Sequence, residues 1–129
     1  MKNIKKIGLL TTLILLVSFT VLQISQEKEK IIGAWISEGA PNSKWVFKND
    51  GKCYDYLDGN LDKTYYYSIE TTTPQCFEEV PVGELFSYLK VVNIADSNDY
   101  YCYEILSLDD YDLQIRWLKR GGSIYFKRQ

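Results

Sequence analysis

The chain of 129 residues contains no histidine, and this excludes the commonest catalytic and metal-binding arrangements. Without an imidazole there is no Ser-His-Asp or Cys-His nucleophile and no ordinary zinc site. The three cysteines include no Cys-x-x-Cys pair, which argues against redox catalysis. Neighbouring carboxylates, as in Glu78-Glu79 and Asp109-Asp110, rarely converge on one substrate bond. We therefore expect a protein that is not an enzyme and uses no cofactor.

Clustered positive charge is also lacking. Three of the 15 Lys and Arg residues precede residue 7, so the remainder of the chain carries 12 basic against 17 acidic residues. Phosphate binding needs basic side chains gathered on one face. The one local grouping, at residues 116–128, has the spacing of the solvated faces of a terminal hairpin. We therefore do not expect nucleic acid as a partner.

A partial match to a calcium-binding loop also fails. Asp58, Asn60 and Asp62 have the spacing of its first ligands, but Lys63 stands where that loop needs glycine and Ile69 where it needs a bidentate glutamate. We expect a hairpin turn at this point and no metal site.

The longest apolar run covers residues 7–22 and follows three lysines within the first six positions. A basic start and an apolar core of this length are what a secretory translocon reads, and the lysines keep the N-terminus inside. We expect the chain beyond it to lie outside the cytoplasm, in the cell envelope or secreted.

Two interpretations of residues 1–25 stay open, a cleaved signal peptide and an uncleaved single-span membrane anchor. The candidate cleavage positions match the small-residue pattern poorly. Extended through Ile24, the run would cover roughly 27 Å at about 1.5 Å per residue, enough for a thin bilayer. The first cysteine, Cys53, lies too far from the run to carry a lipid. Residues 26–30 alternate in charge and are expected to be a tether.

From residue 31 onward, β-branched and aromatic residues alternate with polar ones, which is the period of half-buried strands. The strongest signal is a hairpin of residues 44–48 and 52–57 around Asn49-Asp50-Gly51. Pro74 and Pro81 indicate an irregular connection over residues 70–83. Further strands are expected at residues 31–36, 64–69, 87–94, 99–106, 113–117 and 124–126. The pattern predicts an all-β domain over residues 31–129 with about eight short strands, whose turn spacing is typical of a barrel or a sandwich.

The aromatic residues admit two roles, packing in the core and binding a ligand. Tyrosine is a favoured strand residue, but it is also enriched where proteins recognise partners. Eight strands enclose just enough space for packed side chains or one small ligand. The residues expected in the core are Trp35, Trp45, Phe47, Trp117 and Phe126. The candidate ligand-binding residues are Trp35, Tyr54, Tyr56, Tyr65, Tyr67 and Tyr103.

Three cysteines in an exported domain allow one internal disulfide and leave one thiol over. We expect Cys76 to pair with Cys102, because a bridge from the irregular connection to a strand removes the most freedom from the unfolded chain. Cys53 is then expected to be a buried free thiol.

Several short motifs occur in an order that resembles the small bacterial lipocalin-like domain. They are Gly33-x-Trp35, Trp45-x-Phe47-x-x-Asp50-Gly51, Tyr103-Glu104-Ile105-x-x-Leu108, Leu113-x-Ile115 and Phe126-x-Arg128. The resemblance spans roughly residues 31–129. It implies an all-β fold of an exported protein, namely an antiparallel up-and-down barrel, here of roughly eight strands, with a small interior that Trp35 closes at one end.

Two functions are consistent with these features. The first is a non-catalytic exported binding domain, for a small apolar ligand or for a protein or glycan partner. The second is a membrane-tethered structural or assembly module whose barrel is filled by its own side chains. Enclosed volume distinguishes them, because a drug-sized ligand needs roughly 300 Å³ or more.

Overall fold

The computed structural model describes residues 26–71, 76, 80–81 and 85–129. The expected leader at residues 1–25 and most of the expected irregular connection lie outside the described residues. Among the residues that are described, no helix is both long enough and apolar enough to cross a membrane.

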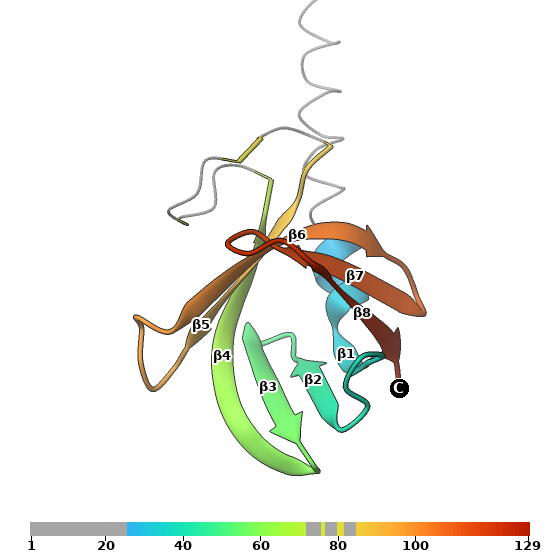
Figure 1. Ribbon diagram of the computed structural model, residues 1–129, viewed down its shortest axis with the longest axis vertical. Coiled ribbons are helices and arrows are strands. Elements are labelled where there is room, and N and C mark those ends of the chain that lie inside the picture. Colours follow the sequence, from blue (N-terminus) through green and yellow to red (C-terminus); the bar gives the residue numbers. More distant parts are fainter. Residues whose placement is uncertain (1–25, 72–75, 77–79, 82–84) are drawn as a thin grey trace, which may run out of the picture.

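Eight antiparallel strands close into one barrel, in which each strand pairs with the next and β8 returns to β1 (Figure 1). This confirms the predicted all-β barrel and its number of strands. Closure pairs both edges of the sheet, so none of the eight strands that the structure describes is left as an open edge. The strands are β1 (Gly33–Ser37), β2 (Ser43–Phe47), β3 (Lys52–Leu57), β4 (Asn60–Glu70), β5 (Tyr88–Asn93), β6 (Tyr100–Leu108), β7 (Asp112–Trp117) and β8 (Ser123–Arg128).

The predicted turns have the backbone conformations that their residues favour. Between β2 and β3, Gly51 has φ 85°, and the Asp50 carboxylate accepts the Lys52 amide at 3.0 Å. Between β3 and β4, Asp58 and Gly59 have φ 53° and 79°. The segment that begins like a calcium loop is therefore a two-residue hairpin turn.

The first strand begins two residues later than the sequence indicated. Residues 26–31, the first five of which were expected to be a tether, are helical, and the last of them is fully buried. Gly33 follows with φ 132°, and a Cβ there would lie 2.6 Å from Nη1 of Arg128. That guanidinium donates hydrogen bonds to the carbonyls of Lys30 and Ile32, the latter at 2.8 Å. Glycine is needed at position 33 because the backbone bends there and passes close to this side chain.

The barrel has two different ends. We call the one that carries residues 26–31 the helix end, and it also holds the β2–β3 and β6–β7 turns. We call the opposite one the turn end, and it holds the β3–β4, β5–β6 and β7–β8 turns.

The barrel interior is filled by apolar side chains, because alternate residues of every strand face inward. Trp35, Phe47 and Phe126 are buried as expected, whereas Trp45 and Trp117 are partly buried and pack against this core. The buried core residues are Ile31, Trp35, Phe47, Cys53, Tyr65, Ile69, Leu89, Val91, Tyr103, Leu113, Ile115 and Phe126.

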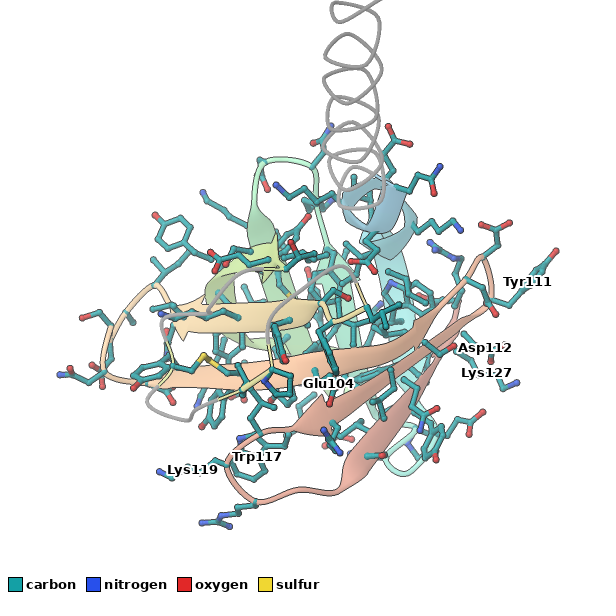
Figure 2. The ribbon with its side chains drawn as sticks, turned by 90° about the horizontal axis from the view of Figure 1, so that it is seen from above. Glu104, Tyr111, Asp112, Trp117, Lys119 and Lys127 are labelled. Atoms are coloured by element: carbon teal, nitrogen blue, oxygen red, sulfur yellow. A yellow bond between two sulfur atoms is a disulfide. The ribbon has the colours of Figure 1, made fainter. Side chains whose placement is uncertain are left out.

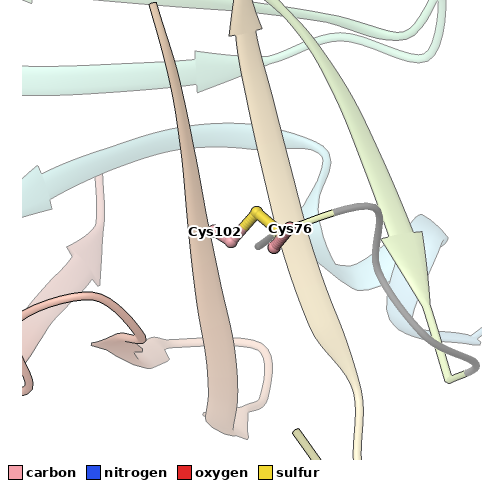
Figure 3. The surroundings of a disulfide bond; sticks show 2 residues. All are labelled: Cys76 and Cys102. Carbon is pink, nitrogen blue, oxygen red and sulfur yellow. A yellow bond between two sulfur atoms is a disulfide. The ribbon is translucent and has the colours of Figure 1, made fainter. Parts of the chain in front are cut away.

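A disulfide joins Cys76, in the connection after β4, to Cys102 on β6 (Figure 3). The pairing is the one expected from the sequence. Cys102 is on the outer face of the barrel, opposite Lys90 of β5, so the bridge holds the connection against the outside of the sheet. Cys53 is the remaining thiol, and it is free and buried as expected.

Candidate functional site

The residues that the sequence suggested for ligand binding lie on both faces of the barrel wall. Tyr65, Tyr67 and Tyr103 share the inward face with the core. Tyr54 and Tyr56 alternate with the buried Cys53 on β3 and therefore face outward. The six suggested residues thus do not converge on one site.

Trp35 closes the helix end. Its side chain is fully buried, and its indole N–H donates to the carbonyl of Ile31 at 2.8 Å. The Arg128 guanidinium lies 4.2 Å from the centre of the ring. Because its indole N–H is hydrogen-bonded to Ile31 and its ring face is covered by Arg128, Trp35 acts as a structural residue.

Aromatic side chains gather inside the barrel toward the turn end. The Trp45 ring lies 6.0 Å from that of Tyr103, 6.5 Å from that of Tyr65 and 5.3 Å from that of Phe126. These separations are typical of interacting aromatic pairs. Beyond them, Tyr101 meets Trp117 edge to face at 5.9 Å. We call Trp45, Tyr65, Tyr101, Tyr103 and Trp117 the aromatic cluster.

A polar network lies beside the aromatic cluster at the same end. The Lys63 ammonium is 3.2 Å from the Asp99 carboxylate, which also accepts a hydrogen bond from the Asn93 amide at 2.9 Å. The Tyr101 hydroxyl hydrogen bonds with the same carboxylate. Hydrogen bonds from Asn93 and Lys63 lower the pKa of Asp99, so this group is a stable anion with its partners in place.

Asp55 is a second carboxylate at the turn end, and its pKa is shifted in the opposite direction to that of Asp99. It follows Cys53 by two residues on β3 and pairs with Trp45 across the strands, so it faces inward. Burial raises its pKa, and the nearby Asp62 raises it further, while Lys63 and a hydrogen bond with Trp45 act in the opposite direction. In the described parts of the chain, no Lys or Arg lies within ion-pair distance of its carboxylate.

A pocket of about 430 Å³ lies on the outer face of the barrel. One wall is the Glu104–Arg116 ion pair, which joins β6 to β7, and Figure 2 shows Glu104 and Trp117 on these neighbouring strands. The opposite wall belongs to the connection after β4, where the Tyr88 hydroxyl donates to the carbonyl of Pro81. The lining residues are Val80, Pro81, Phe86, Tyr88, Glu104, Arg116, Trp117, Leu118 and Gly121.

The disulfide and this outer pocket are linked. The Leu118 amide donates to the carbonyl of Cys102 at 3.1 Å, so the pocket wall and the bridged strand position are in direct contact. The other half of the bridge, Cys76, belongs to the connection that also supplies Val80 and Pro81. The covalent link therefore supports both walls of the pocket.

Sequence reasoning missed Asp55 and the outer pocket for different reasons. The position of Asp55 two residues after Cys53 on β3 was enough to place both on the same inward face, because successive side chains of a strand alternate between faces. The pocket had no such signal, since its lining comes from three strands, the β7–β8 turn and a connection whose shape no periodicity predicts.

Groups of histidine, cysteine, aspartate and glutamate that could hold a metal ion do not occur among the described residues. No known protein family, curated protein or solved structure matches the chain.

Proposed function

We propose that this chain is a non-catalytic, lipocalin-like binding domain that takes a small, largely apolar molecule in the outer pocket. The observation that carries the proposal is the pocket itself, whose volume of about 430 Å³ falls within the range of small-molecule sites. Val80, Phe86 and Leu118 supply apolar walls, and the Glu104–Arg116 pair supplies a polar edge for orientation.

The filled interior supports an outer rather than an inner site for an apolar ligand. Trp35, Leu89 and Ile115 have no exposed surface, and they occupy the space that a larger barrel leaves for its cargo. An apolar ligand is therefore accommodated where the structure has space for it, between the connection after β4 and the sheet.

We also propose that the domain works outside the cytoplasm, with residues 1–25 as its leader or membrane anchor. The Cys76–Cys102 bridge supports this location, because structural disulfides persist in oxidising compartments.

Native mass spectrometry of the full-length protein, purified from its source, tests the ligand. We expect a co-purifying small molecule that is lost in Leu118→Glu, since a carboxylate in the apolar wall opposes apolar binding. Leu106→Glu is the matched control, because Leu106 on the neighbouring strand is 42% exposed and does not line the pocket. Absence of any bound molecule, or equal retention by both variants, would count against the proposal.

A structural or assembly module is the second candidate, and the packed core favours it. A barrel filled by its own side chains needs no ligand to be stable. Native mass spectra that show only the chain without a bound molecule would favour this second function over ligand binding.

A further inference from the structure

We infer that the outer face of β2, β3 and β4 binds an acidic polysaccharide, a chain of sugars that carries carboxylate or phosphate groups at intervals. Figure 1 shows these three strands side by side in the barrel wall. The surface shares no residue with the outer pocket, so the inference goes beyond the proposed function and does not depend on it. We call this surface the lysine–tyrosine face, and its members are Lys44, Lys48, Lys52, Tyr54, Tyr56 and Tyr66.

Alternation along β3 defines the middle of the lysine–tyrosine face. Lys52, Tyr54 and Tyr56 alternate with inward-facing residues, the first of which is the buried Cys53, so all three point outward. On the next strand, Tyr66 lies opposite Lys52 and is 53% exposed. One lysine and three tyrosines therefore share the outer surface of β3 and β4.

Two more lysines reach the same surface from β2 and from the residue that follows it. Lys44 lies opposite Tyr56, and its ammonium is 5.1 Å from the centre of that ring. Lys48 follows the buried Phe47, and its amide donates to the carbonyl of Lys52 at 2.9 Å. Lys48 and Lys52 are therefore neighbours across the two strands.

The positive charge of this face is not balanced by carboxylates. In the part of the chain that the structure describes, none of the three lysines lies within ion-pair distance of a carboxylate. Asp50, in the turn between Lys48 and Lys52, accepts the backbone amide of Lys52 instead. Like charges that lie opposite each other on neighbouring strands repel. An anion bound beside Lys48 and Lys52 would relieve this repulsion.

The spacing of the charges fits an extended chain rather than a single small anion. Lys44 and Lys48 are four residues apart on one face, a separation of about 13 Å at roughly 3.3 Å per residue. Tyr54 lies between them, opposite Val46. A ligand that reaches both lysines must therefore cross an aromatic ring. The flat apolar surface and the hydroxyl of that ring suit the C–H faces and the hydroxyl groups of a sugar.

Two other extended anions fit the face less well. A nucleic acid carries a charge on every nucleotide, and beyond residue 6 the chain has 17 acidic residues against 12 basic ones, which repel so dense a charge. An acidic peptide gains affinity by adding a strand to an open sheet edge, and none of the eight described strands is an open edge. A polysaccharide with widely spaced acid groups avoids both difficulties.

Isothermal titration calorimetry of the full-length chain tests the inference with oligogalacturonate as the probe. A polyoxyethylene detergent is suitable, because it carries neither sugar nor charge, and divalent cations are left out because they cross-link this oligomer. We expect saturable binding that weakens as salt is added, since salt screens the charges of exposed lysines. The fully methyl-esterified oligomer keeps the sugar chain and lacks the charge, and we expect it to bind at least about tenfold more weakly.

Two double variants locate the binding surface. Lys48→Gln with Lys52→Gln removes two charges from the lysine–tyrosine face, and we expect it to weaken binding by about tenfold or more. Lys28→Gln with Lys119→Gln removes the same charge from two exposed positions outside the face and should leave the affinity unchanged. Because Lys48 and Lys52 repel each other, their replacement should not lower the melting temperature, so a loss of binding would not reflect unfolding.

Several outcomes would overturn the inference. They are equal binding of the acidic and the esterified oligomer, equal affinity in the two double variants, tighter binding of oligothymidylate or polyglutamate than of oligogalacturonate, and no saturable binding up to roughly 1 mM. The comparison of the two oligomers uses the unaltered protein, so it decides the question even if a variant fails to fold. Leu118→Glu, which alters the outer pocket, should bind oligogalacturonate as the parent does, so failure of one proposal leaves the other intact.

Discussion

At the scale of single residues, the turn end holds two aspartates whose surroundings act in opposite directions. Asp99 accepts hydrogen bonds from Asn93 and Lys63, which lower its pKa. Asp55 faces the interior, where burial raises its pKa. The same side chain therefore stabilises the fold at neutral pH in one position and opposes it in the other.

Asp55→Asn is expected to raise the free energy of unfolding at pH 7. Because the folded-state pKa of Asp55 is raised, its ionisation costs stability as the pH rises from the unfolded value of about 4 through the folded value. The advantage of the asparagine should thus be full at neutral pH and vanish below about pH 4. Urea denaturation at a series of pH values measures it.

Asp99→Asn provides the opposite case. The lowered pKa of Asp99 means that its stabilising effect is present above about pH 4 and is lost as the pH falls through the folded-state value. The variant should therefore be less stable than the parent at pH 7. If both variants shift stability in the same direction, the assignment of Asp55 to the inward face is wrong.

Trp45 tests the packing of the aromatic cluster. Its ring contacts Phe126 at 5.3 Å and Phe47 at 6.0 Å, so Trp45→Ala removes contacts to the core and leaves a cavity. We expect a loss of about 3 kcal/mol in thermal or urea denaturation. Tyr66→Ala, next to the buried Tyr65 but itself 53% exposed, is the control and should cost less than about 1 kcal/mol.

At the scale of elements, covalent and hydrogen-bonded links attach two non-strand segments to the barrel. Arg128 on β8 donates to the carbonyls of Lys30 and Ile32, which holds residues 26–31 across the helix end. The disulfide likewise attaches the connection after β4 to β6, through Cys76 and Cys102. Both segments lie between strands or before them, so neither is held by the sheet's own hydrogen bonds.

Cys76→Ser is expected to destabilise the protein by about 2 to 4 kcal/mol, because the bridge closes a loop with a sequence separation of 26 residues. Denaturation under non-reducing conditions measures the loss. The double variant Cys76→Ser with Cys102→Ser should cost no more stability than either single variant, since all three lack the same bond.

Free Cys53 should not react with thiol reagents in the native state, because burial raises the pKa of its thiol.

At the scale of the whole molecule, the order of a basic, apolar N-terminus before a disulfide-bonded barrel predicts its orientation in the cell. Protease added to intact spheroplasts should digest residues 31–129, and reduction of the disulfide should speed the cleavage. Full protection of the barrel without lysis would place the domain inside and contradict the proposed location.

The sequence by itself determined an all-β domain of about eight strands, the turns at Gly51 and Gly59 and the pairing of Cys76 with Cys102. These features follow from local causes, namely period-two alternation, glycine at positive φ and the small number of possible cysteine pairs. Tertiary structure alone decided that the strands close into a barrel, that Trp45 of β2 meets Tyr103 of β6 inside it, and that a pocket lies outside the wall. Such sites depend on how distant strands are aligned around a closed barrel, and that alignment is set by packing rather than by any single segment.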